Sequence, residues 1–343
     1  MTSFIRLIRF KNLLIITLTQ VVIKFSLISP YLSNSALSNI DFCIYLFALI
    51  AIVAGGYIIN DIYDIEIDKI NKPEARIIEK KISKKFAFKA YYMLNLIGIT
   101  SGFYAAYQVN KLWLGIIFIY FTISLWQYSK QHKISFIIGN LQVAFLTALS
   151  ILNLVLLDIE EFSTLLMNLG WMIYSCLGQD TWGNFIREEY IEPISSPIIL
   201  YIIIFYAGFS FITTLIREII KDLEDAEGDT KIGANTLAIK FGMQRTKQII
   251  ILLNILPILG IAYFQYFQYS VLSSTFSIEL SYWGVNYISA AYTVLLQVLL
   301  ITLILKVSSS HTKADFHAAS TLSKTIMIMG ILSIPLFTYL HLY

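Results

Sequence analysis

The sequence predicts an all-α membrane protein in which nine transmembrane helices form one bundle around a central cavity. Of its 343 residues, 57% are hydrophobic and only 14% are charged, whereas soluble domains carry about 25% charged residues. Long apolar runs recur along the whole chain, and basic residues concentrate in every second connection between them. A single domain, residues 1–343, accounts for these features, with cytoplasmic helical caps that carry two aspartate-rich motifs.

Nine segments of the chain are predicted to span the membrane, because an apolar run of about 18 or more residues is typical of a transmembrane helix. A shorter apolar segment near 163–178 predicts an interfacial or re-entrant helix. Cys43 and Cys176 lie in apolar surroundings without the spacing of a disulfide or metal motif, so we expect buried structural thiols. The predicted spans are residues 12–30, 40–60, 86–107, 112–129, 134–157, 196–216, 247–269, 284–307 and 321–341.

The charges of the connections predict the orientation of the bundle. The connections after the second, fourth, sixth and eighth spans are rich in Lys and Arg, while the alternate connections are nearly bare of them. Basic loops face the cytoplasm, so we expect the N-terminus and both acidic motifs on that side and the C-terminus outside. The acidic loop 158–194 suits the outer side. The expected location is the cytoplasmic (inner) membrane of a prokaryote.

Two acidic motifs each follow a predicted span directly. The first is NDIYDIEID at 60–68, and the second is REIIKDLEDAEGD at 217–229. Carboxylates at the end of a spanning helix are costly, which makes them candidates for a functional site. Spacings of three or four residues place side chains on one helix face. The residues aligned in this way are Asn60, Asp64 and Asp68 in the first motif and Asp222, Asp225 and Asp229 in the second.

The two aligned rows of carboxylates predict a shared magnesium site, because like charges on one helix face repel each other. Mg²⁺ is held by one or two carboxylates and bridges to substrate phosphate, whereas neither motif resembles a calcium loop and no His/Cys group suggests zinc. Facing magnesium sites would bind a diphosphate, and nearby cations would stabilise it as a leaving group. The alternative is two solvated helix ends with ordinary surface charges. The candidate cations are Arg76, Lys133, Arg217 and Lys221.

These motifs resemble those of the UbiA superfamily of intramembrane prenyltransferases. NDIYDIEID followed by NKPEAR, and KDLEDAEGD followed by LAIKFG, are similar to its two aspartate-rich motifs. RLIRFKNLL near the N-terminus, and Tyr128 and Ser129 followed by Lys133, are also similar, so the resemblance runs from about residue 5 to the end. Segment 72–77 departs from the family's N-x-P-x-R-P, since it has an extra residue and lacks the second proline. This departure affects the placement of Arg76.

The resemblance implies nine spans and assigns roles to individual residues. The row from Asn60 to Asp68 would serve one magnesium–diphosphate side, and the row from Asp222 to Asp229 would serve the other. Tyr128 would belong to the pocket. The residues implied for catalysis are Asp64, Asp225, Lys133, Arg76 and Tyr128, and those implied for binding a prenyl diphosphate are Asn60, Arg76, Lys133, Arg217 and Lys221.

The implied reaction is the Mg²⁺-dependent transfer of an isoprenyl group from a prenyl diphosphate to a lipophilic acceptor. The second motif looks most like the branch that prenylates geranylgeranylglyceryl phosphate, whose phosphate Lys69 or Lys72 would meet. The alternatives are an aromatic acceptor of quinone biosynthesis or haem and, more distantly, a cation-coupled transporter, which would place its carboxylates near the bilayer midplane. The expected partners are both substrates and membrane lipid, with no nucleic acid and no obligate protein partner. Aromatic candidates for stabilising a carbocation are Tyr57, Tyr63, Tyr128 and Trp126.

Overall fold

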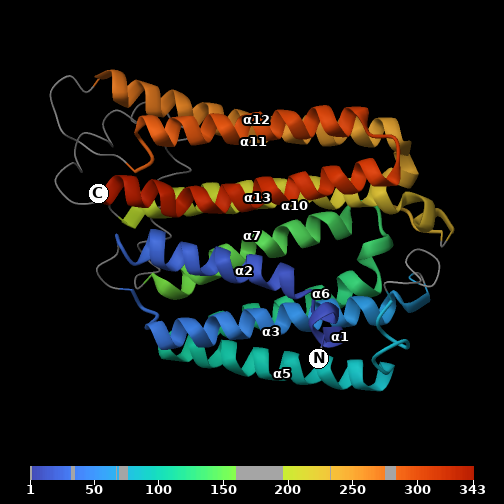
Figure 1. The fold of residues 1–343 in the computed structure, drawn as a ribbon. Coiled ribbons are helices and arrows are strands. Elements are labelled where there is room, and N and C mark those ends of the chain that lie inside the picture. The colour runs from blue at the N-terminus through green and yellow to red at the C-terminus, as the bar shows by residue number, and fades with distance from the viewer. Residues whose placement is uncertain are drawn as a thin grey trace.

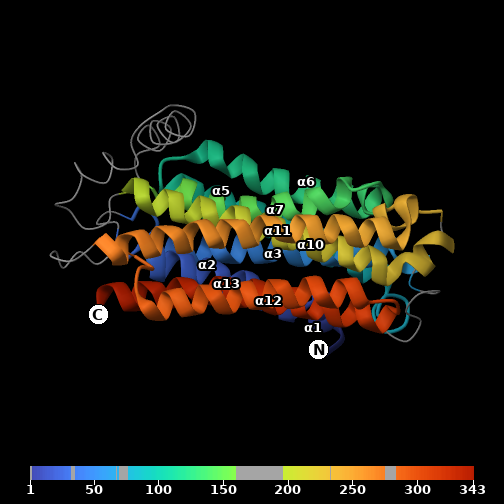
Figure 2. The same cartoon turned by 90° about the horizontal axis from the view of Figure 1, so that it is seen from above.

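The fold is a bundle of long helices. The computed structural model describes residues 2–31, 35–66, 68, 76–159, 196–231, 233–274 and 283–343, and within these ranges β-pairing is limited to two isolated bridges. The long helices lie side by side in a common direction in both views (Figures 1 and 2). The elements are α1 (Thr2–Leu7), α2 (Phe10–Val22), the π-helix η1 (Ile23–Ile28), α3 (Asn39–Tyr63), α5 (Lys84–Gln108), the 3₁₀ helix η2 (Leu112–Gly115), α6 (Ile116–Lys130), the 3₁₀ helix η3 (His132–Ile134), α7 (Ile138–Asp158), α10 (Ser196–Lys231), α11 (Leu237–Ser274), α12 (Tyr287–Ser309) and α13 (Lys313–Leu342).

Each of the nine predicted spans corresponds to a helix in the described part of the chain. Eight of these helices are long and apolar enough to cross a membrane. The ninth, α5, has 25 residues but a more polar sequence. It packs closely on α3 and α6, since a Cβ on Gly98 would lie 2.7 Å from Ile52 Cγ1 and one on Gly102 would lie 2.4 Å from Phe118 Cγ. Close approach through small residues is a common way for helices to associate in membranes.

The second acidic motif lies in the final turns of a spanning helix and not in a separate cap. The 36 residues of α10 correspond to about 54 Å at about 1.5 Å per residue, while the hydrocarbon core of a bilayer is about 30 Å thick. The predicted span ended at residue 216, whereas the helix continues to Lys231. The helical spacing of the motif predicted this continuation, and charged residues replace apolar ones at that point without breaking the helix.

The first acidic motif continues the helical path of α3. The amide of Asp64 donates to the Asn60 carbonyl oxygen (2.9 Å), and the amide of Asp68 donates to the Asp64 carbonyl oxygen (2.7 Å). The motif therefore keeps the spacing that aligns its three side chains, although α3 itself ends at Tyr63.

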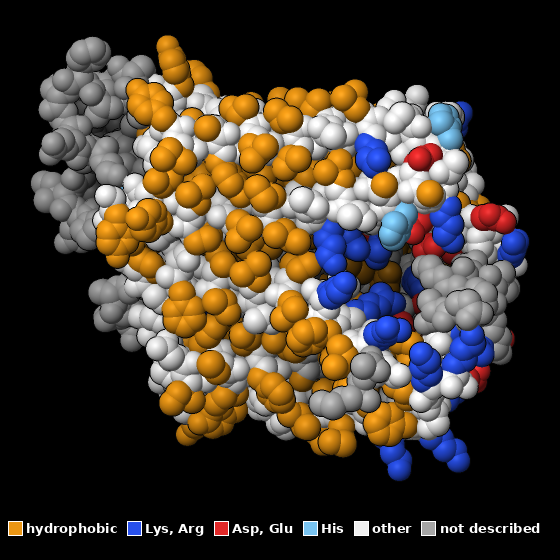
Figure 3. Space-filling view, viewed as in Figure 1, with side chains coloured by type: hydrophobic (Ala, Val, Ile, Leu, Met, Phe, Trp, Pro, Cys, Tyr) orange, Lys and Arg blue, Asp and Glu red, His pale blue; other side chains and the backbone are white. Residues whose placement is uncertain are grey.

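Charged side chains gather at one end of the bundle, and the rest of the visible surface is mainly apolar (Figure 3). Both acidic motifs lie at this end, and the C-terminus lies at the other (Figure 1). Large apolar side chains such as Leu259 and Tyr263 are exposed along the helices, as expected for a surface in lipid. Cys43 is exposed too, so the expectation of a buried thiol was wrong: its side chain points outward from α3, where a small apolar group suits lipid. Cys176, segment 163–178, Lys69 and Lys72 lie outside the described residues.

A buried ion pair joins three segments at the end of the bundle opposite the acidic motifs. Lys24 Nζ lies 2.7 Å from Asp158 Oδ2, and the two side chains are 1% and 0% exposed. Lys24 Nζ also donates to the Leu37 carbonyl oxygen (2.8 Å), while Asp158 Oδ1 accepts from Ser35 Oγ (2.8 Å) and the Leu37 amide (2.9 Å). These contacts connect η1, the segment before α3 and the end of α7.

Removing one partner of this pair should destabilise the protein more than removing both charges. Asp158→Ala leaves Lys24 buried without a counter-charge, so we expect the free energy of unfolding to fall by about 3–5 kcal/mol. Lys24→Met combined with Asp158→Asn should recover most of that loss. Unfolding of the detergent-solubilised protein by SDS or heat measures both variants, and equal losses in the single and double variants would contradict the assignment.

Candidate active site

A cavity of about 700 Å³ extends into the bundle from its charged end. Its walls come from α1, α2, α3, α6, η3, α7, α10 and α13. Both acidic motifs line it, although they are more than 150 residues apart in the sequence (Asp68 and Asp222). The helices therefore bring the two aligned rows of carboxylates to one site.

The first motif is held by its own asparagine and by a lysine from η3. Asn60 Nδ2 donates to Asp64 Oδ2 (2.6 Å), and Lys133 forms an ion pair with the same carboxylate. Asp68 also lines the cavity. Because Asp64 is buried, the lysine supplies the positive charge that a buried carboxylate requires.

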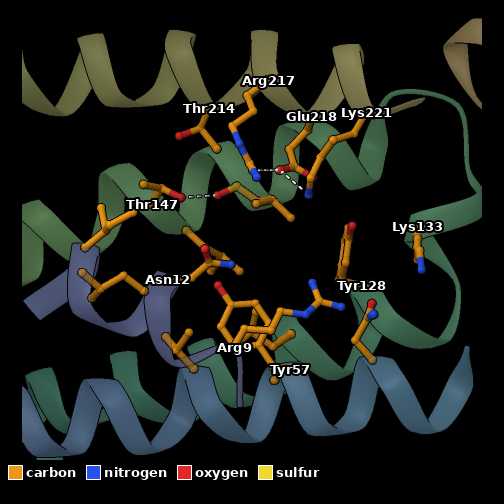
Figure 4. Close-up of a pocket in the computed structure, with 18 of the residues that line it drawn as sticks. Arg9, Asn12, Tyr57, Tyr128, Lys133, Thr147, Thr214, Arg217, Glu218 and Lys221 are labelled. Carbon is orange, nitrogen blue, oxygen red and sulfur yellow. Dashed lines mark hydrogen bonds and ion pairs between the residues drawn. The ribbon is translucent and has the colours of Figure 1, made fainter. Parts of the chain in front are cut away.

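Arg9 contributes a second cation on this side of the cavity. Its Nη2 lies 3.0 Å from Asp61 Oδ1, and its guanidinium lies 5.0 Å from the centre of the Tyr57 ring. Burial lowers the pKa of Arg9, but the charge of Asp61, with smaller contributions from Tyr57 and Asp64, outweighs this effect, so the net pKa is raised. The Arg9 backbone has a φ of 50°, which residues other than glycine rarely adopt. This conformation separates α1 from α2 and directs the guanidinium into the cavity (Figure 4).

The second motif combines a buried carboxylate, two cations and a contact from α7. Glu218 Oε1 lies 2.8 Å from Arg217 Nη1 and 3.0 Å from Lys221 Nζ. Asn140 Nδ2 donates to Asp222 Oδ2 (2.7 Å), and Lys313 Nζ approaches Asp225 Oδ1 at 3.9 Å. The motif is therefore tied to α7 and α13 as well as to its own helix.

Most residues predicted from the sequence lie around this one cavity. In Figure 4, Arg217, Glu218 and Lys221 face Arg9, Tyr57 and Tyr128 across it, with Lys133 at one side. The predicted residues that line the cavity are Asn60, Asp64, Asp68, Tyr57, Tyr128, Lys133, Arg217, Lys221, Asp222, Asp225 and Asp229.

Three predicted residues do not line the cavity. Arg76 lies in the turn before α5, where its Nη1 is 3.7 Å from Glu79 Oε2. Tyr63 is exposed, and the Trp126 ring contacts the ammonium of Lys130 at 4.7 Å. The sequence placed the aromatic residues by membrane depth alone, which does not determine whether a side chain points into the bundle or out of it.

The deeper walls of the cavity carry large apolar side chains, and the amide of Gln20 beside them has hydrogen-bond partners. Leu49, Phe121 and Ile151 line this part. Gln20 lines it too, but its Nε2 donates to the Ser150 carbonyl oxygen (3.2 Å) and its Oε1 accepts from the Tyr45 hydroxyl (3.2 Å). The cavity thus has a charged mouth and an apolar interior, which suits a ligand with an anionic head and a long hydrocarbon tail.

The polar residues of the lining that sequence reasoning missed include Arg9, Asn12, Asn140, Glu218 and Lys324. Arg9 and Asn12 lie in the N-terminal segment RLIRFKNLL, whose resemblance to the family does not single out individual residues. Asn140 and Lys324 are isolated polar residues in predicted spans, a signal that was available. Glu218 lies within the second motif but off its aligned row.

The side chains fit magnesium in donor type and in arrangement. All six aligned residues offer oxygen, the preferred ligand of Mg²⁺. Among the described residues, no three acidic, His or Cys side chains already form a ligand group. Mg²⁺ rarely occupies an all-protein cage and instead combines one or two carboxylates with water and substrate phosphate. Each motif can supply that number, so the assignment of these residues as metal ligands stays a prediction.

Arg9 should contribute to anion binding at the mouth of the cavity. A charge-assisted hydrogen bond is worth about 1.5–3 kcal/mol, so Arg9→Gln should weaken the binding of inorganic diphosphate with Mg²⁺ about 10- to 100-fold. Titration calorimetry of the detergent-solubilised protein measures the affinity. Arg245→Gln is the matched control, because Arg245 is exposed and does not line the cavity. Equal affinities for the two variants would remove Arg9 from the anion site.

Comparison with known proteins identifies the family of this chain. Residues 25–322 match the model of the UbiA prenyltransferase family. The chain is 30% identical over 331 residues to the digeranylgeranylglyceryl phosphate synthase of Methanococcus aeolicus, covering 96% of this chain and 95% of that protein. The enzyme of the same name from Sulfolobus acidocaldarius is 32% identical over 210 residues, which span 60% of this chain and 59% of that protein.

Solved structures share the fold. A digeranylgeranylglyceryl phosphate synthase structure superposes with a TM-score of 0.59 at 22% identity, covering 98% of each chain. A UbiA homologue from Archaeoglobus fulgidus, bound to GPP and Mg²⁺, gives a TM-score of 0.58 at 12% identity and covers 97% of this chain and 99% of that one. The extent of the family match, together with the full-length relative, shows that this chain belongs to the UbiA prenyltransferase family.

Proposed function

We propose that this protein transfers an isoprenyl group from a prenyl diphosphate to the hydroxyl of a phosphate-bearing glycerol lipid, of the geranylgeranylglyceryl phosphate type, in a Mg²⁺-dependent reaction. The observation that carries the proposal is the single cavity with both acidic motifs at its mouth and an apolar interior. The names of the relatives from Methanococcus and Sulfolobus support the acceptor class.

The diphosphate of the donor would lie between the two acidic motifs. Bound Mg²⁺ would neutralise the leaving diphosphate at the aligned rows around Asp64 and Asp225. Lys133 and Lys221, which lie on opposite walls (Figure 4), would donate to phosphate oxygens. Cations placed where negative charge develops lower the barrier to departure of the leaving group.

The bond between C1 of the isoprenyl group and the diphosphate oxygen would break, and the diphosphate would leave with the electron pair. The acceptor hydroxyl oxygen would bond to C1 and lose its proton. The rings of Tyr57 and Tyr128 line the cavity, and aromatic faces stabilise cations. The apolar interior around Phe121 would hold the hydrocarbon chains and exclude the water that would otherwise capture the carbocation.

The orientation proposed for the bundle places both motifs and the N-terminus in the cytoplasm, in the inner membrane of a prokaryote. The basic residues support this orientation, since they concentrate at the end that carries the motifs (Figure 3) and basic segments face the cytoplasm.

Neutralising one carboxylate in either motif should abolish the reaction. Asp64→Asn and Asp225→Asn should each lower kcat by about 100-fold or more, the scale seen when one group that stabilises developing charge is removed. Release of diphosphate from labelled geranylgeranyl diphosphate with Mg²⁺ and acceptor measures turnover. Glu227→Gln serves as the control, because this side chain belongs to the same motif but is 90% exposed.

The acceptor class can be tested with a panel: geranylgeranylglyceryl phosphate, 4-hydroxybenzoate, dihydroxynaphthoate and homogentisate. A single product from the glyceryl phosphate would support the proposal, and a single product from an aromatic acid would replace its acceptor. A kcat within a few-fold of the wild-type value in either aspartate variant would refute the site assignment.

The topology gives an independent prediction. With an odd number of spans, a reporter fused to the C-terminus should behave as non-cytoplasmic, and one fused to the N-terminus should behave as cytoplasmic. Paired fusions to alkaline phosphatase and a fluorescent protein measure both. Two termini on the same side would require an even number of spans.

A further inference from the structure

One lysine of the cavity wall differs from the other cations in its surroundings. Lys324 lies on α13, lines the cavity, and donates from Nζ to Asn12 Oδ1 (2.8 Å) on α2. Asn12 lines the cavity as well. The lysine is only partly exposed, and its hydrogen bond is to a neutral amide.

Four other cations of the cavity have a carboxylate partner. Arg9 contacts Asp61, and Lys133 contacts Asp64. Arg217 and Lys221 share Glu218. For Lys324, no carboxylate of the described ranges lies within ion-pair distance.

The surroundings of Lys324 add further positive charge. Arg217 and Lys11 both act on it as like charges, and Arg6 lines the same cavity. Lys and Arg side chains gather where α1, α2 and α13 meet, next to a hollow in the surface (Figure 3). A cation inside a membrane bundle is costly unless it is paired, so this group of residues favours an anion from outside the chain.

The group is separate from the proposed diphosphate position. Asn12 lies three residues after Arg9, and in Figure 4 it lies on the opposite side of the Arg9 guanidinium from Lys133. The diphosphate position already has Lys133 and Lys221 on its walls. The proposed reaction brings one further anion into the cavity, and that is the phosphate of the acceptor.

We propose that Lys324 and Asn12 bind the phosphate monoester of the acceptor, an inference that rests on the proposed function. A phosphate monoester carries a charge of about −1.5 to −2 at neutral pH, and lysine binds phosphate as a point charge. The Asn12 amide orients the lysine through Oδ1 and offers N–H donors of its own. The pair therefore selects phosphorylated acceptors, since an acceptor without the phosphate leaves the ammonium without a counter-charge.

The test compares acceptors with and without the phosphate. Lys324→Met keeps the length of the side chain and removes its charge, while Lys324→Arg keeps the charge. The matched control is Lys89→Met, because Lys89 is an exposed lysine of α5 that does not line the cavity. Steady-state rates are measured with geranylgeranyl diphosphate as donor and either geranylgeranylglyceryl phosphate or geranylgeranylglycerol as acceptor.

Lys324→Met should raise KM for the phosphorylated acceptor about 10- to 100-fold, the effect of losing one charge-assisted contact. KM for the donor and KM for geranylgeranylglycerol should stay within about twofold of the wild-type values. Lys324→Arg should restore most of the affinity, and Lys89→Met should have no effect. Asn12→Asp provides a second variant with an intact Lys324, and its carboxylate should compete with the phosphate and raise the same KM.

Three results would overturn the inference while leaving the proposed function intact: an unchanged KM for the phosphorylated acceptor, an equal rise for both acceptors, or a rise in the donor KM instead. Wild-type protein that prenylates only aromatic acceptors would overturn both the acceptor class and this site. Wild-type protein that forms no product with any acceptor would refute the proposed function itself.

Discussion

The constraint on which this structure depends is the crowding of carboxylates from two distant motifs around one cavity. Negative charges gathered around one cavity raise the free energy of the folded state unless cations or hydrogen-bond donors face them. The chain supplies these from other helices: Arg9 for Asp61, Lys133 for Asp64 and Asn140 for Asp222. Each contact crosses between elements, so the electrostatic requirement of the site also determines which helices must be neighbours.

The connection between α6 and α7 meets this requirement for both motifs at once. Its Lys133 contacts Asp64, and Asn140, in the first turn of α7, donates to Asp222. The connection is tight, since a Cβ on Gly139 would lie 2.5 Å from the His132 carbonyl oxygen. The Ile134 carbonyl oxygen in this connection also accepts a hydrogen bond from the backbone N–H of Asn235 (2.9 Å). A short segment thus sets the distance between the halves of the bundle that carry the two motifs.

The sequence predicted the bundle and the aligned rows well because both follow from local periodicity. Spans depend on runs of apolar residues, and the row from Asn60 to Asp68 depends only on a helical path through the motif. The contacts of Arg9 and Lys324 could not be predicted in this way, since their partners depend on how helices pack. Arg76 shows that a resemblance in sequence does not determine where a side chain lies. Its motif is similar to that of the family, but the turn before α5 places its guanidinium near Glu79. Hydropathy placed the membrane boundary at residue 216, and the spacing of the second motif predicted that the helix continues beyond it.

The polar residues deep in the cavity differ from those at its mouth in how far a ligand can reach them. At the mouth, cations and carboxylates remain at the cavity surface, where a charged ligand can reach them. Deeper in the cavity, Gln20 is fully buried in the protein. Its side-chain nitrogen donates to the Ser150 carbonyl oxygen, and its side-chain oxygen accepts from the Tyr45 hydroxyl. A buried polar group whose hydrogen bonds are satisfied has little reason to retain a water molecule. The interior around Leu49 and Phe121 can therefore stay dry, and dryness protects a carbocation from hydrolysis. In the proposed reaction, this division of polar groups along the cavity would serve the chemistry at C1 together with the acidic motifs.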